Sequence, residues 1–134
     1  MRKLLGGKTI LCVVGCMLFL GGWLVGQERA STQKTTIHAA AWTARDGLGQ
    51  QDFENFKKET AGLVGKVPGL RRVWVGKLRA PINAEGVQRN YGIILEFDGV
   101  KSKEAYSDNH PSPWYENFGK LRQPGSTNFD VVGE

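Results

Sequence analysis

The alternation of apolar and polar positions divides the chain into a leader and a domain of short strands and helices. Residues 36–42 form an uncharged run that ends at the Asp46-Gly47 turn signal, and this pattern predicts a first strand. A stripe at helical spacing follows, made of Phe53, Phe56, Thr60, Leu63 and Val67. This spacing predicts a helix that ends at Pro68-Gly69, because proline lacks a backbone donor and glycine permits the turn.

The next segments predict two strands and a short helix. Residues 70–78 and 91–97 are rich in Val, Ile, Leu and aromatic residues, which favours strands. Residues 79–89 contain proline, asparagine and glycine, so we expect a polar loop between them. Residues 101–107 predict a short helix with Ser102 as its cap.

The last segments predict one more helix and a closing strand. Ser112-Pro113 combines a capping hydroxyl with a proline that fits the first turn of a helix. An apolar stripe at helical spacing follows, formed by Trp114, Phe118 and Leu121. Residues 127–132 predict the fourth strand. The order β-α-β-β-α-α-β indicates an α+β, ferredoxin-like subunit with a four-stranded antiparallel sheet and a second helix broken in two.

Neither side of the predicted sheet is clearly polar. In residues 91–97, Ile93 and Leu95 share one side, while Ile94 falls on the other side with Glu96 as the one charged residue. Helices can cover one side of an open four-stranded sheet, so the other side needs a second apolar partner. The economical partner is a second copy of the same sheet, and we predict a homodimer with two-fold symmetry.

The leader has the layout of a targeting segment. Three basic residues, Arg2, Lys3 and Lys8, precede an uncharged run of 19 residues from position 9 to position 27. This predicts a signal peptide or an N-terminal membrane anchor over residues 1–26, crossing the membrane through residues 9–26 if it is not cleaved. Acylation at Cys16 is a third alternative. All three place the domain outside the cytoplasm, in the periplasm or at the cell surface of a bacterium.

Charge and cysteine content separate the leader from the domain. Residues 27–35 are polar and predict a flexible linker, and residues 36–134 form the domain. Residues 1–35 hold five basic residues and one acidic residue, and the remainder holds thirteen and twelve. The nearly neutral domain argues against nucleic-acid binding. Cys12 and Cys16 both lie in the leader, so the domain has no disulfide.

Short motifs between residues 38 and 132 resemble a known family. Residues 66–70 (KVPGL) resemble a turn between helix and strand in the stress-responsive dimeric α/β-barrel (Dabb) family, and residues 95–98, 104–106 and 110–111 resemble its LEF…AY…HP pattern. His38 and residues 129–132 also fit. The resemblance implies a ferredoxin-like subunit whose sheet pairs with that of its mate to make a barrel. It implies no single chemistry, since members range from stress-induced proteins to a few polyketide cyclases.

The cyclase members of that family are similar to this chain at His38, Tyr106 and the His-Pro segment. Pro113 stands where their acid/base histidine lies, and Tyr91 stands where one cyclase has a histidine. The resemblance therefore implies a cyclase site only if His110 substitutes for the missing group.

The candidate site residues each have a structural alternative. His38 is either a hydrogen-bonded core residue or a general base, with Tyr106 or His110 as its partner. The ligand-pocket candidates are His38, Trp42, Tyr91, Tyr106, His110 and Trp114. The tryptophans, Trp74 included, serve core packing equally well. A metal site of His38 and His110 with Asp108 or Glu96 has suitable residue types but no recognisable spacing, so we predict no metal.

Two functions remain open on the sequence. The first is an exported or membrane-tethered Dabb-type homodimer that binds a small, apolar molecule without catalysis. The alternative is a cofactor-independent enzyme of polyketide-cyclase or monooxygenase type that uses a His/Tyr pocket. No phosphate loop, dinucleotide fingerprint or nucleophile elbow is present, and we predict no cofactor. A cavity shared by His38 and a second polar group favours the enzyme, whereas a sealed His38 excludes it.

Overall fold

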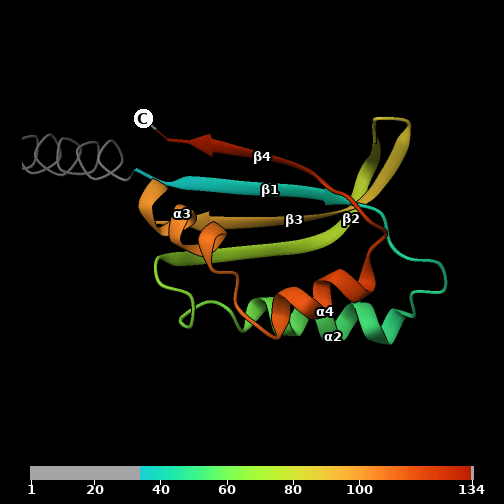
Figure 1. Ribbon diagram of the computed structural model, residues 1–134, viewed down its shortest axis with the longest axis horizontal. Helices are drawn as coiled ribbons and strands as arrows, with labels where there is room; N and C mark the ends of the chain where they lie inside the picture. Colours follow the sequence, from blue (N-terminus) through green and yellow to red (C-terminus); the bar gives the residue numbers. More distant parts are fainter. Residues whose placement is uncertain (1–33, 134) are drawn as a thin grey trace, which may run out of the picture. The chain divides into compact units, whose positions relative to one another are not determined.

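Four antiparallel strands form one sheet in the order β2-β3-β1-β4 (Figure 1). The computed structural model describes residues 34–133, and the predicted leader and most of the predicted linker lie outside them. The strands are β1 (Thr36–Trp42), β2 (Leu70–Ala84), β3 (Val87–Phe97) and β4 (Thr127–Val132). The helices are α2 (Gln50–Ala61), α3 (Val100–Asp108) and α4 (Trp114–Leu121). This confirms the ferredoxin-like order, and the bounds of β1 and β4 are those predicted.

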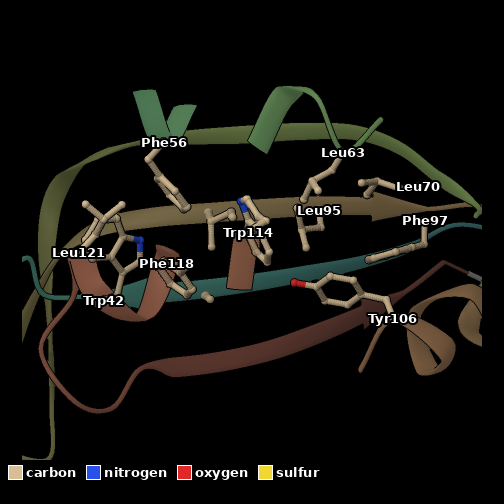
Figure 2. Close-up of a cluster of buried hydrophobic side chains, with 12 residues drawn as sticks. Trp42, Phe56, Leu63, Leu70, Leu95, Phe97, Tyr106, Trp114, Phe118 and Leu121 are labelled. Carbon is tan, nitrogen blue, oxygen red and sulfur yellow. The ribbon is translucent and has the colours of Figure 1, made fainter. Parts of the chain in front are cut away.

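All three helices pack on one side of the sheet. Their buried side chains meet the inward-facing residues of β1 and β3 in a single core, much of which Figure 2 shows. The predicted stripe of α4 is buried as expected, and its Trp114 indole donates a hydrogen bond of 2.9 Å to the Thr60 hydroxyl of α2. Each aromatic ring buried here removes a large apolar area from water, so packing alone can hold a domain without disulfides.

The first predicted helix is too long. We expected it to reach Pro68-Gly69, but α2 ends at Ala61 and Gly62 caps it. The chain then continues in tight turns, in which the Leu63 N–H donates to the Thr60 carbonyl. Leu63 stays buried in the core although it lies outside the helix. The helical spacing therefore reported burial correctly but not the backbone conformation.

The predicted polar loop over residues 79–89 is wrong. β2 and β3 continue through it as a hairpin that projects beyond the rest of the sheet (Figure 1). The two turn residues, Glu85 and Gly86, both have positive φ, at 52° and 76°, which suits a tight two-residue hairpin. Pro81 is accommodated because the register of the two strands shifts between Lys77 and Ile82.

Both predicted serine caps are also wrong. Gly99 caps α3, and the Ser102 hydroxyl donates to the Asp98 carboxylate at 2.5 Å. Pro113 is the cap residue of α4, and the Ser112 hydroxyl bonds the Glu116 carboxylate at 2.7 Å. In each case the hydroxyl donates to a nearby carboxylate, and no side-chain hydrogen bond caps the helix.

The other side of the sheet is apolar, and no element within residues 34–133 covers it. Trp74, Ile94, Phe129 and Val131 are exposed there, and a shallow groove of about 310 Å³ runs over this face. Glu96 is the charged residue expected on this side, and Arg72 donates two hydrogen bonds to it, of 2.8 and 3.0 Å. The prediction of a sheet without a clearly polar side is confirmed. Within residues 34–133, no helix has the length and apolar character needed to cross a bilayer.

Candidate functional site

His38 lies on β1 with its ring on the helix-covered side of the sheet. β1 and β4 pair so that His38 stands opposite Asp130, and the two side chains meet in a contact of 2.6 Å between His38 Nδ1 and Asp130 Oδ1. Because a carboxylate only accepts hydrogen bonds, this contact places a proton on Nδ1 and leaves Nε2 outside the contact with Asp130. A histidine held in this way is suited to act as a base.

Asp130 also binds Lys103 of α3. The ammonium nitrogen lies 2.6 Å from Asp130 Oδ2, so each carboxylate oxygen has its own cationic or N–H partner. Burial by itself raises the pKa of Asp130, but the hydrogen bonds from Lys103 and His38, with their positive charges, bring that pKa below its ordinary value. Asp130 is therefore an anion at neutral pH and fixes the His38 ring.

A small cavity of about 60 Å³ lies beside His38. It is enclosed by β1, β3, α3, α4 and the segment that leads into β4. Four predicted site residues line it together, and they are His38, Tyr106, His110 and Trp114. The cavity is also lined by Tyr115, Arg122, Ser126 and Asn128, none of which was predicted. At the share of about 30 Å³ that each water takes in the liquid, this volume holds about two water molecules, so the cavity fits a very small ligand rather than a polyketide chain.

Tyr106 projects from α3 into the core on the helix-covered side of the sheet, with its hydroxyl directed toward Trp114 (Figure 2). Its ring centroid lies 6.3 Å from that of His38 and 4.8 Å from that of His110. Burial is the main cause that raises the pKa of the Tyr106 hydroxyl far above its usual range. The hydroxyl therefore keeps its proton at neutral pH and can donate a hydrogen bond to a ligand oxygen.

His110 follows α3 and stacks on Tyr115, with ring centroids 4.0 Å apart and an interplanar angle of 23°. Burial lowers the pKa of His110 below its usual value of 6.5, and the positive charges of His38 and Lys103 lower it further. His110 is therefore mostly uncharged at neutral pH. Its ring lies close to Tyr106, with centroids 4.8 Å apart.

Four predicted residues lie away from this cavity, and they are Trp42, Tyr91, Trp74 and Glu96. Trp42 is fully buried and stacks on Tyr91, with ring centroids 4.7 Å apart, in the part of the core near α2. Trp74 lies on the uncovered side of the sheet. Glu96 lies on that side too and is bound by Arg72, so it cannot join His38 and His110 in a metal site. Within the described part of the chain, no group of three or more His, Cys, Asp or Glu side chains gathers.

Asp130 and Lys103 are site residues that the sequence reasoning missed. A usable signal was present, because alternation along residues 127–132 puts Asp130 on the side opposite Phe129 and Val131. A lone charged residue on the inner side of a strand needs a partner. What the sequence could not supply was the register that sets Asp130 opposite His38.

Comparison with known proteins identifies the fold. No family model matches the sequence, and no curated protein matches it. A dimeric ferredoxin-like protein of unknown function from Thermobifida fusca is 16% identical, with a TM-score of 0.57 over 75% of this chain and 92% of its own. A Dabb family protein with a ferredoxin-like fold from Mesorhizobium loti is 12% identical, with a TM-score of 0.50 over 75% and 97%.

A third similar structure is an enzyme. Hydroxynitrile lyase from Passiflora edulis is 13% identical, with a TM-score of 0.56 over 75% of this chain and 94% of its own. At these identities the similarities establish a ferredoxin-like fold, shared with a dimeric protein and with a protein of the Dabb family. They assign no activity, because the fold carries unrelated functions.

Proposed function

We propose that this domain is a Dabb-type dimeric α/β barrel that binds a small polar molecule in the His38 cavity and transfers a proton to or from it. The observation that carries the proposal is the Asp130–His38 hydrogen bond beside a cavity that Tyr106 also lines. His38 is not sealed by side chains, so the condition that would exclude an enzyme is not met. The leader sequence supports export of the domain.

Homodimer formation is supported by the uncovered side of the sheet. Trp74 is 46% exposed, Ile94 38% and Phe129 56%, and these side chains flank the groove on that face. Exposed apolar groups gathered on one face mark an interaction site, because their transfer from water is favourable. The dimeric state of the Thermobifida fusca protein, which has the same fold, agrees with a second copy as the occupant.

The proposed chemistry assigns one role to each polar group. His38 Nε2 removes a proton from a carbon next to a ligand carbonyl, and Asp130 holds the ring and stabilises its cationic form. The electron pair of the C–H bond moves into the enolate, whose oxygen accepts a hydrogen bond from Tyr106. Return of the proton from His38 completes the cycle without a cofactor.

The small size and mixed polarity of the His38 cavity favour a small polar ligand over the apolar ligand of the alternative proposal. The cavity is bounded by His38, His110, Ser126 and Asn128 as well as by aromatic rings. An apolar ligand would leave these polar groups desolvated without partners, which costs about 1–3 kcal/mol for each. A small carbonyl compound satisfies them.

Deuterium exchange tests the proposal. Hydroxyacetone is incubated with the wild-type protein in D₂O, and loss of the proton signal next to its carbonyl is followed by NMR. We expect exchange faster than in buffer, a loss of about 10²–10⁴-fold in His38→Gln, and a loss of about 10²–10³-fold in Tyr106→Phe.

Tyr91→Phe is the matched control, because Tyr91 stacks in the core away from the cavity. It should retain the wild-type exchange rate. Equal rates in His38→Gln and the wild type, or no acceleration by the wild type, would contradict the proton-transfer role.

A further inference from the structure

Arg122 lines the same cavity as His38 and has no part in the chemistry described so far. It is the first residue after α4, and a β-bridge to Ala44 fixes its backbone. Its guanidinium carbon lies 4.8 Å from the centre of the Phe118 ring, and Phe118 lines the cavity as well. The side chain is therefore held along the cavity wall by stacking and not by an ion pair.

The positive charge of Arg122 is unmatched. Within residues 34–133, no ion pair is formed between Arg122 and a carboxylate. Its Nε atom is buried and has no hydrogen-bond partner. A buried donor on a charged group is expensive to leave unpaired, so this atom indicates an acceptor that a ligand would supply.

Asp130, the carboxylate that binds His38, is not free to serve as that acceptor. Asp130 is already engaged by Lys103 and by His38, at 2.6 Å in each case. The cavity therefore keeps a surplus of positive charge.

We propose that Arg122 binds the carboxylate of the ligand and that the ligand class is therefore small 2-oxo acids. This inference rests on the proposed function and adds the substrate class to it. A planar guanidinium matches the geometry of a carboxylate, and a cavity of about 60 Å³ limits the ligand to the smallest 2-oxo acids, of which pyruvate is the probe. With its carboxylate at Arg122, the ligand presents its carbonyl to the remaining polar groups of the same cavity.

The proton transfer balances for such a substrate. His38 Nε2 takes a proton from the carbon next to the carbonyl, the C–H electron pair forms the carbon–carbon double bond of the enolate, and the carbonyl pair moves to oxygen. Return of a proton, or of a deuteron from D₂O, to the same carbon regenerates the acid. No oxidant or reductant is needed.

The experiment compares pyruvate with hydroxyacetone, a neutral probe of similar size, in D₂O. We expect Arg122→Gln to slow exchange of the pyruvate methyl protons at least about 30-fold, because a charged pair is lost. Exchange of hydroxyacetone should change less than about two-fold, since it carries no carboxylate. Arg45→Gln is the matched control, because Arg45 is exposed and lies outside the cavity, and it should change neither rate.

A second readout is independent of turnover. The buried Nε–H of Arg122 should give a ¹H–¹⁵N signal that shifts on addition of pyruvate or acetate and not of hydroxyacetone. An Arg122 signal that pyruvate does not shift would overturn the assignment of Arg122 as the carboxylate-binding residue. Equal rates of pyruvate exchange in Arg122→Gln and the wild type would overturn it as well. In either case, accelerated exchange of hydroxyacetone by the wild type would still support the proposed function.

Inorganic phosphate is the competing anion. If it displaces pyruvate at equal concentration, Arg122 binds anions in general and the 2-oxo acid assignment is overturned. If the wild type accelerates deuterium exchange of neither pyruvate nor hydroxyacetone, both the proposed function and the assignment of Arg122 fail. Failure of the Arg122 assignment alone would instead leave hydroxyacetone exchange accelerated.

Discussion

The ring of His38 is oriented by a carboxylate 92 residues further along the chain. Neither residue has a role by itself: an isolated histidine rotates freely, and an isolated Asp130 on the inner side of β4 would be an unpaired charge. The sequence identified His38, Tyr106 and His110 because motifs mark them. It did not identify Asp130, Lys103 or Arg122, since strand register and the turn after α4 bring these to the cavity.

Replacement of Asp130 by asparagine tests the contact between Asp130 and His38. Asp130→Asn removes the charge shared by Lys103 and His38, and we expect the free energy of unfolding at pH 7 to fall by about 1 kcal/mol, because the side chain is partly exposed. Since folding lowers the pKa of Asp130, its contribution is present above the ordinary value of 3.8 and is lost as the pH falls through the lowered folded-state value.

Urea unfolding of both proteins between pH 7 and pH 2 provides the measurement. The difference between wild type and variant should persist to below pH 3.8 and vanish in stronger acid. Asp108→Asn removes an exposed carboxylate at the end of α3 and serves as the control. A difference that grows on acidification would show that Asp130 is not stabilised as an anion.

Secondary-structure elements whose apolar pattern and turn signals agreed were predicted well. β1, β4 and the stripe of α4 match because their hydrophobic residues repeat within clear boundaries. The hairpin of β2 and β3 was missed, because Glu85 is an unusual residue for a positive φ and Pro81 suggested a loop. α2 was extended too far, because buried positions continue past Gly62 in turns that preserve the same spacing.

The connection between α2 and β2 depends on Gly69, which has a φ of +75°. A Cβ at this position would overlap the Ser102 side chain and the Asp98 carboxylate. We expect Gly69→Ala to destabilise the domain by about 3 kcal/mol, through backbone strain and this overlap together.

Gly65 offers a matched comparison, because its φ of +85° is similar but an added Cβ would meet open space. Gly65→Ala should cost about 1 kcal/mol, from strain alone. Thermal unfolding of both variants provides the measurement, and equal losses would show that the contact with α3 does not constrain Gly69.

At the scale of the whole molecule, the sheet separates two functions between its two sides. The helix-covered side holds the cavity, and the apolar uncovered side is free for a partner subunit. Because the cavity lies on the helix side, dimer formation through the other side leaves it accessible.

Substitution on the uncovered side tests the assembly. Ile94→Asp should convert the dimer into a folded monomer, because Ile94 is 38% exposed in the protomer and becomes a buried, unpaired carboxylate only in the dimer. Light scattering on the domain at micromolar concentration gives the mass. Val64→Asp changes an apolar residue that is 43% exposed beyond α2, and it should remain dimeric. A dimeric Ile94→Asp protein would place the interface elsewhere.

The most direct test of the central claim, that His38 is a base held by Asp130 and open to a ligand, is the ¹⁵N spectrum of its ring. We predict a proton on Nδ1 in its hydrogen bond to Asp130, and a shift of the Nε2 signal when hydroxyacetone is added. An Nδ1 without a proton in the free protein, or an Nε2 signal that hydroxyacetone at saturating concentration does not move, would contradict the account.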